Sequence, residues 1–152
     1  MTIQNYSPDF YKQEYVQAIA STTSTAAGDV NGNIIPVEGA TGFNFITRAT
    51  GGSALAVDKY LILKSIQFGN ADMSANITTY LIDSGYILVK GQKVNVSTDL
   101  RLAAVGNFKA GIANFAINGQ TAVRAVYTIV GTSPNIIWEG HCIKTIDTTP
   151  SS

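Results

Sequence analysis

The segment Trp138-Glu139-Gly140-His141-Cys142 places a carboxylate, an imidazole and a thiol within four residues. On a strand, Glu139 and His141 point to the same face, where they could form an acid–base pair or supply two metal ligands. Cys142 points to the opposite face, and the sequence contains no second His or Cys to complete a zinc site. We therefore interpret His141 as a strand residue with a local partner and Cys142 as a small apolar core residue.

A second segment carries oxygen ligands. Asp29, Asn31 and Asn33 occupy positions 1, 3 and 5 of a pattern that begins like a calcium loop. Position 6 is Ile34, where the loop requires Gly, and position 12 is Ala40, where it requires Glu. Asp29, Asn31 and Asn33 are thus the candidate metal ligands of this sequence, but the pattern favours a turn and we expect no bound metal.

Other catalytic signatures are missing from the sequence. It has no Gly-x-Ser-x-Gly nucleophile motif and no phosphate-binding loop. We therefore predict a protein that is not an enzyme and that has no cofactor. Aromatic residues near predicted turns could stack on sugars, which leaves carbohydrate binding open as an alternative. These aromatic candidates are Tyr80, Tyr86 and Phe108.

The charge of the chain excludes further classes of partner. Ten Lys and Arg balance ten Asp and Glu, and charged residues make up 13% of the chain, about half the usual share. Without a basic excess, we expect no nucleic-acid binding by charge. No apolar run approaches the length of a membrane helix, and the first residues do not form a secretory signal. We expect a protein made in the cytoplasm in soluble form, without a signal peptide or a membrane partner.

The start of the chain differs in pattern from the rest. Ser7-Pro8-Asp9 is a good helix start, and the apolar residues that follow recur at helical spacing. The sequence predicts a helix over about residues 8–20, followed by a Ser/Thr-rich linker over residues 21–28. We take residues 1–33 as an N-terminal helix with an extended arm, whose helix docks either on its own domain or on a neighbouring subunit.

The rest of the chain has the spacing of short strands. Phe43–Arg48, Val57–Phe68 and the segments after them are separated by Gly, Asp, Ser and Asn. In Val57–Phe68, apolar residues fall on both faces, which predicts a strand covered on both sides. The predicted fold is all-β, an antiparallel, jelly-roll-like β-sandwich of about eight strands over residues 34–146. Residues 147–152 are predicted to form a disordered tail.

Two turns divide the later strands. Asn118-Gly119 separates Ile112–Ile117 from Gln120–Val130 and predicts a two-residue hairpin. Lys90-Gly91-Gln92 predicts another tight turn between two short strands. In the last strand, Trp138, Cys142 and Ile146 alternate with Ile137, Glu139, His141 and Ile143.

The segment from Ser7 to Ala20, the Ser/Thr linker and the β-rich block from Phe43 to Ile146 together resemble small structural proteins of virus particles. The resemblance is to bacteriophage head-decoration, fibre or coat proteins, and it is one of general character over the whole chain. It implies a β-sandwich that self-associates, in some cases as a trimer, or attaches to the other proteins of a capsid. Its location would then be the virion.

From this resemblance and the low charge, we expect a structural protein whose partners are itself and other virion proteins. A carbohydrate- or host-surface-binding module is the alternative. The expected assembly contacts are Phe10, Tyr11, Tyr15 and Ile19.

Overall fold

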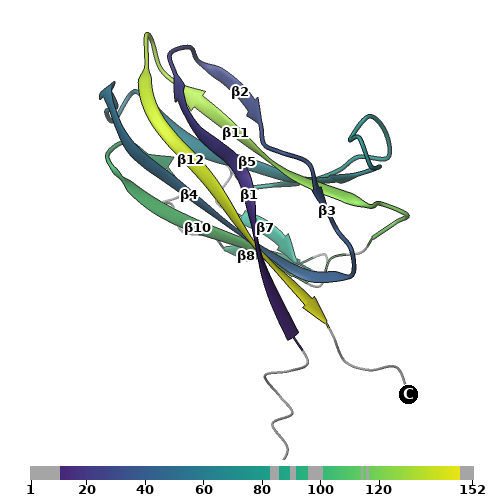
Figure 1. The fold of residues 1–152 in the computed structure, drawn as a ribbon. Coiled ribbons are helices and arrows are strands. Elements are labelled where there is room, and N and C mark those ends of the chain that lie inside the picture. Colours follow the sequence, from purple (N-terminus) through teal and green to yellow (C-terminus); the bar gives the residue numbers. More distant parts are fainter. Residues whose placement is uncertain are drawn as a thin grey trace, which may run out of the picture.

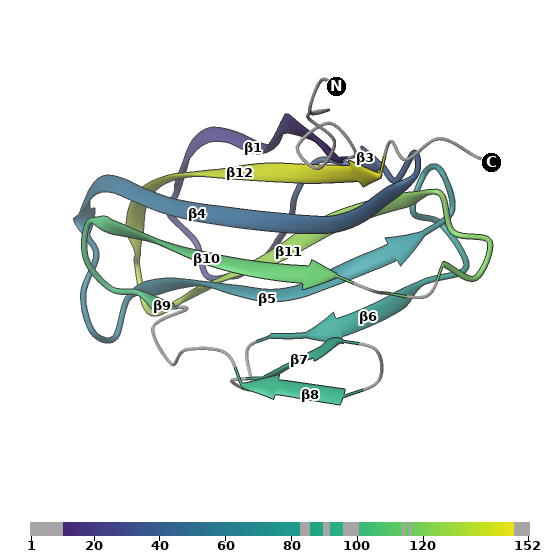
Figure 2. The ribbon, with the colours of Figure 1, turned by 90° about the horizontal axis from the view of Figure 1, so that it is seen from below.

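A computed structural model of the chain describes residues 11–82, 86–89, 92–95, 101–113, 115 and 117–147. These residues form two large antiparallel sheets that face each other, and a small hairpin beside them (Figures 1 and 2). The first sheet has the order β1 (Tyr11–Ser24), β12 (Asn135–Asp147), β4 (Ala40–Ala54) and β10 (Gly106–Ala113). The second has the order β2 (Gly28–Asn31), β11 (Ala122–Val130), β5 (Tyr60–Gly69) and β6 (Thr78–Leu81), with β3 (Ile35–Pro36) on β11 and β9 (Arg101–Leu102) on β5.

This order of strands is that of a jelly roll. Chain neighbours β1 and β2, β4 and β5, and β10 and β11 lie in opposite sheets, so the chain crosses repeatedly between the two layers. The hairpin of β7 (Tyr86–Val89) and β8 (Gln92–Asn95) lies beyond β6 (Figure 2). The two strands that flank the predicted turn pair with each other, with Val89 opposite Gln92, while Lys90 and Gly91 lie outside the described residues.

The predicted N-terminal helix is wrong, because its described part is strand β1. β1 pairs with β12, with Val16 opposite Cys142 and Tyr15 opposite Ile143. Two shifts of register, between Gln17 and Thr22, interrupt the alternation of the strand. Such bulges hide the period-two pattern of a strand. Pairing with β12 gives the backbone of β1 hydrogen-bond partners on a neighbouring strand, whereas a lone short helix is only marginally stable in water. No helix in the described part of the chain could span a lipid bilayer.

Strand β5 corrects a second expectation. Leu61, Leu63, Ile66 and Phe68 all point into the core, although plain alternation would put the two leucines and the other two residues on opposite faces. The register against β11 passes from Leu63 to Ser65, so Lys64 is the extra residue of a bulge. The bulge shifts the alternation by one, and all four apolar side chains therefore face one side. The strand is not covered on both faces in the way the sequence suggested.

The predicted hairpin at Asn118-Gly119 is also wrong. β10 pairs with β4 and β11 pairs with β5, so the two strands flanking this turn belong to different sheets. Gly119 has a positive φ of 74°, and Asn118 does not, whereas a type I′ turn needs both. The turn residues fix a local reversal, but each strand pairs where its apolar face is buried.

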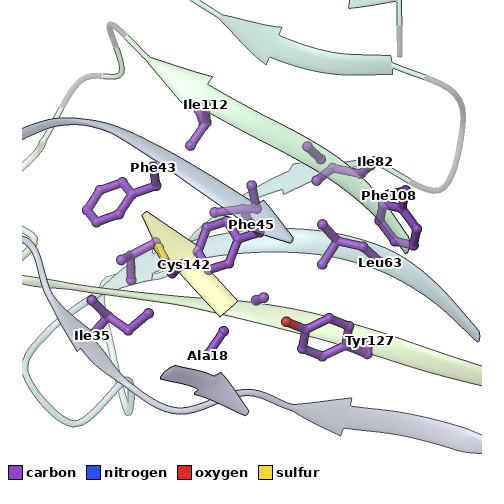
Figure 3. Close-up of a cluster of buried hydrophobic side chains, with 14 of the residues drawn as sticks. Ala18, Ile35, Phe43, Phe45, Leu63, Ile82, Phe108, Ile112, Tyr127 and Cys142 are labelled. Carbon is purple, nitrogen blue, oxygen red and sulfur yellow. The ribbon is translucent and has the colours of Figure 1, made fainter. Parts of the chain in front are cut away.

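The core lies between the two sheets (Figure 3). Phe43 and Phe45 of β4 face Phe68 of β5, and the Phe43 and Phe68 rings meet edge to face at 6.0 Å. Tyr127 of β11 reaches across to β12, where Gly140 leaves room for its hydroxyl group, and its ring packs 4.8 Å from that of Trp138. A methyl group at Gly140 would collide with this hydroxyl, so the two sheets can approach here because position 140 lacks a side chain.

The last strand follows its predicted alternation. Trp138 and Cys142 are fully buried, and Glu139 and His141 lie on the outer face of the first sheet. Lys144 continues the inward-facing series and is 2% exposed. At the end of β12, Asp147 pairs with Tyr11, so the two ends of the described chain lie side by side.

Candidate functional site

The two ends of the sandwich are closed in different ways. We call one the Val57 end: it holds the turns that join β1 to β2, β4 to β5 and β11 to β12. Gly131 in the last of these turns has a φ of 125°, and a Cβ atom there would lie 2.5 Å from the carbonyl oxygen of Asp58. Val57 and Val105 are exposed at this end, at 80% and 68%. Backbone therefore packs directly on backbone here.

The opposite end, which we call the Gln120 end, is closed by side chains. Gln120 is 3% exposed, and its amide nitrogen donates to the Asn76 carbonyl oxygen at 2.8 Å and to the Thr78 hydroxyl at 2.7 Å. The Asn76 side chain in turn donates to the Asn118 carbonyl oxygen at 2.9 Å. The side-chain oxygen of Gln120 has no hydrogen-bond partner among the described residues. An unpaired buried acceptor is costly, so this oxygen would favour a donor.

Lys144 holds the same end from the β12 side. Its ammonium group donates to the Pro36 carbonyl oxygen at 2.7 Å and lies 3.4 Å from the Glu38 carboxylate. Lys144 is buried, whereas the Glu38 side chain is 68% exposed. This contact could not be predicted from the sequence, because a Lys near the end of a strand is usually a solvated residue.

A cleft of about 500 Å³ opens at the Gln120 end. Six of its lining residues are apolar: Ile34, Pro36, Val37, Ala71, Ile117 and Ala122. Glu38, Gln120 and Thr121 add polar groups. Ile34 and Ile117 remain about two-fifths exposed. The volume lies within the range of protein binding sites, and a mainly apolar wall with few polar groups is their usual character.

His141 has the local partner that the sequence suggested, Glu139, and a second partner, Tyr15, from the neighbouring strand β1. Its Nε2 atom lies 2.5 Å from a Glu139 carboxylate oxygen, and its Nδ1 atom is hydrogen-bonded to the Tyr15 hydroxyl. The Tyr15 ring also packs on the imidazole, with 5.5 Å between ring centres. Both ring nitrogens are therefore engaged, and this cluster joins edge strand β1 to β12. The described residues contain no group of three or more His, Cys, Asp or Glu able to hold a metal ion.

The candidate cation ligands do not converge. The Asp29 carboxylate accepts hydrogen bonds from Lys64 at 2.9 Å and from Thr128 at 2.8 Å. These two donors, Lys64 first, lower the pKa of Asp29 below its ordinary value. The Asn33 side chain instead donates to the Gln17 carbonyl oxygen at 3.2 Å, and its backbone nitrogen to Ala18. Asn31 ends β2, opposite Val126.

The predicted assembly contacts fall in different surroundings. Phe10 lies outside the described residues, and Tyr11 is the first residue of β1. Tyr15 is 60% exposed on the outer face of the first sheet. Ile19 packs against the core of its own domain. Of the four, the structure thus shows Tyr15 available on the surface.

Other predicted residues are placed in the interior. Burial raises the pKa of the Cys142 thiol to about 12, which keeps it protonated and unreactive near neutral pH. Phe108 is 8% exposed, and Tyr80 packs edge-on against Phe68. The Tyr86 side chain lies outside the described part. The cleft itself was missed, because its walls come from three segments that no local pattern relates.

No known protein family matches the chain, and no curated protein is similar to it in sequence. Two solved structures are similar to it. One is the VP2 subviral particle of infectious bursal disease virus, with 10% identity and a TM-score of 0.48 over 97% of this chain and 38% of that one. The other is the Gx strain of the same virus, with 9% identity and a TM-score of 0.48 over 99% of this chain and 39% of that one. The present chain thus spans about two fifths of their length.

Proposed function

We propose that this protein is a self-associating structural component of a virus particle. The observation that carries the proposal is the placement of large apolar side chains on both ends of the sandwich. Val57 and Val105 are exposed at one end, and Ile34, Ile77 and Ile117 at the other. Apolar groups gathered at opposite ends of a compact domain suit contacts with two neighbours, as in a layer or shell.

The scarcity of charge supports the same conclusion. With 13% charged residues and no net charge, the surface has little to keep free copies apart. The cores of protein interfaces are depleted of charged residues, so this surface suits permanent contact. The jelly roll is a fold of capsid and lectin domains, which is compatible with this role and does not by itself select it.

An enzymatic role finds little support in the described residues. His141 is held by Glu139 and Tyr15 on an open sheet face. Cys142 is buried and protonated. We therefore include the absence of catalysis in the proposal.

The test is the state of the full chain in solution and in particles. Light scattering coupled to gel filtration is expected to give a mass of two or more chains at micromolar concentration. Virus particles are purified on a density gradient from the organism or sample in which this sequence occurs, and peptides of this chain are expected in them. A chain that stays monomeric at millimolar concentration and is absent from such particles would contradict the proposal.

Carbohydrate binding is the second candidate, and a shallow groove favours it. The groove, of about 310 Å³, lies where β4 and β10 pair and is lined in part by Thr41, Asn44 and Thr145. Asn44 pairs with Ile143, which pairs with Tyr15, so an exposed aromatic ring lies two strands away in the same row. Sugars bind to such rings beside polar side chains. A glycan array with the parent chain and the Asn44→Ala variant tests this candidate: signals that the variant loses favour it.

A further inference from the structure

The cleft at the Gln120 end combines two properties of a built site. Its walls are mainly apolar, and Ile34 and Ile117 at the surface are still partly exposed to water. Gln120, almost fully buried, lines the cleft and keeps one side-chain oxygen without a partner in the described structure. An occupant with apolar side chains would bury Ile34 and Ile117, which are still partly exposed. The Gln120 oxygen is itself almost inaccessible, so it adds a polar group beneath the cleft surface and the apolar walls provide the contact.

The chain supplies a segment with this chemistry next to the same end. β1 begins there, because Tyr11 pairs with Asp147 and the nearby Lys144 bonds to Pro36 in the cleft wall. At least ten residues precede it, and their sequence, Met-Thr-Ile-Gln-Asn-Tyr-Ser-Pro-Asp-Phe, contains one charged side chain. It offers apolar side chains at Ile3, Tyr6 and Phe10. In extended form, ten residues span about 33 Å, enough to reach a neighbouring molecule.

We propose that residues 1–10 of one copy of this chain occupy the Gln120-end cleft of a second copy. The inference rests on the proposed self-association and names the contact that produces it. β1 runs from Tyr11 toward the Val57 end, so the preceding residues could enter the cleft of their own molecule only by reversing direction. A second copy accepts them without a reversal. The low charge of the segment matches the apolar walls of the cleft.

Two variants separate the two halves of this contact. Deletion of residues 1–10 removes the segment and keeps every described strand pair, because β1 starts at Tyr11. Ile117→Asp places a carboxylate at the mouth of the cleft, at a partly exposed position outside the strands. Val57→Asp, at the opposite end, is the matched control. Circular dichroism and the midpoint of thermal unfolding establish that each variant is folded.

The decisive measurement is the mass of the variants alone and mixed, by light scattering at about 50 µM. We expect each of the two variants alone to be monomeric, and Val57→Asp to keep the mass of the parent. An equimolar mixture is expected to form a dimer, since the Ile117→Asp chain supplies the segment and the deleted chain supplies the cleft. If Ile117→Asp does not fold, a labelled synthetic peptide of residues 1–10 replaces it, with fluorescence anisotropy against the deleted chain as the readout.

The outcomes distinguish this inference from the proposed function. A deleted chain that keeps the parent mass, or a peptide that does not bind, overturns the inference and leaves self-association standing. If only Val57→Asp loses the oligomer, the inference is also overturned and self-association stands, because the contact between copies then lies at the Val57 end. A mixture that stays monomeric excludes exchange between copies. A parent chain that is monomeric at about 50 µM overturns the inference, and one that stays monomeric at millimolar concentration and is absent from virus particles overturns both proposals.

Discussion

The Val57 end and the Gln120 end of this sandwich are both tightly bounded, but by different parts of the chain. At the Val57 end, short turns bring backbone against backbone, and Gly131 is needed for the approach to Asp58. At the Gln120 end, buried side chains hold the strands: Gln120 bonds to a loop, and Lys144 bonds to the Pro36 carbonyl oxygen. The closure by side chains at the Gln120 end is accompanied by a cleft.

The comparison indicates which end of such a fold can change its residues and acquire a binding surface. An end closed by backbone tolerates few changes, since each residue is fixed by conformation as well as by contact. An end closed by side chains can be rebuilt one residue at a time, and its polar groups can be shared with a ligand. On this view, the Gln120 end is the adaptable end of the molecule.

Gly131→Ala is expected to have the largest effect, a loss of about 3 kcal/mol in the free energy of unfolding. The new methyl group would meet the Asp58 carbonyl oxygen, and the φ of 125° is unfavourable for Ala. The matched control is Gly39→Ala at the other end. Gly39 also has a positive φ, of 75°, but no atom lies within 4 Å of its added Cβ. We expect it to lose about 1 kcal/mol. Urea denaturation measures both, and equal losses would contradict the distinction between the ends.

Gln120→Ala is expected to lower the free energy of unfolding by about 2 kcal/mol, because Asn76 and Thr78 lose their buried donor. The exposed Gln17→Ala serves as the control and is expected to change it by less than about 0.5 kcal/mol. The same denaturation experiment applies. An unchanged stability in Gln120→Ala would show that side chains do not close this end.

Tyr127→Phe probes the middle of the sandwich, which belongs to neither end. The Tyr127 hydroxyl is buried, and among the described residues it has only a weak interaction with the Thr47 hydroxyl and no well-formed hydrogen bond, so its removal is expected to stabilise the fold by up to about 1 kcal/mol. Burial also raises the pKa of Tyr127 in the folded state. In the unfolded chain the phenol ionises near its ordinary value, so the parent loses stability as the pH rises above about 10. Denaturation at pH 8 and pH 11 is expected to show a smaller loss in the variant; an equal loss would contradict this.

The smallest effect is expected for Asp29→Asn, which breaks the exposed pair with Lys64 and contrasts with the buried Lys144 of the Gln120 end. Half-exposed ion pairs contribute at most about 1 kcal/mol. The pKa of Asp29 is lowered in the folded state, so its contribution is present above the ordinary carboxyl pKa and is lost as the pH falls through the lowered one. Parent and variant are expected to differ at pH 7 and to converge once the pH has fallen below the lowered pKa of Asp29. If the parent and the variant still differ in stability at pH 2, the difference has a cause other than the charge of Asp29.

The alternation of β12 could be read from the sequence, because a regular strand repeats every two residues. Trp138 and Cys142 are buried and Glu139 and His141 face outward, as predicted. β1 could not be read in this way. Tyr15 faces outward, Val16 faces the core, and the register shift after Gln17 brings Ile19 to the core as well, so apolar residues of both faces combine into a spacing that resembles a helix. The bulge at Lys64 had the same effect in β5, where it mimicked a strand covered on both sides.

The candidate site was harder to predict than the strands. The partners of His141 lie close by in sequence or on the neighbouring strand, so a local partner was foreseeable. The Gln120-end cleft depends on segments around residues 36, 71 and 120 that meet only through the sheet order. Ile34 was noted only as a mismatch in a calcium pattern, and Gln120 only as the start of a strand. Chain connectivity, which residue spacing does not encode, creates this site.

The pairing of Tyr11 with Asp147 has a mechanical consequence. The hydrogen bonds of an antiparallel pair lie across the strands. A force that pulls the chain apart at these two residues therefore loads the bonds between β1 and β12 one pair at a time, starting from Tyr11. A force applied between Tyr11 and the Val57 end loads the bonds along β1 together. β1 therefore separates from β12 at a low force when the two chain ends are pulled apart. It resists a higher force when a neighbouring molecule pulls along the strand.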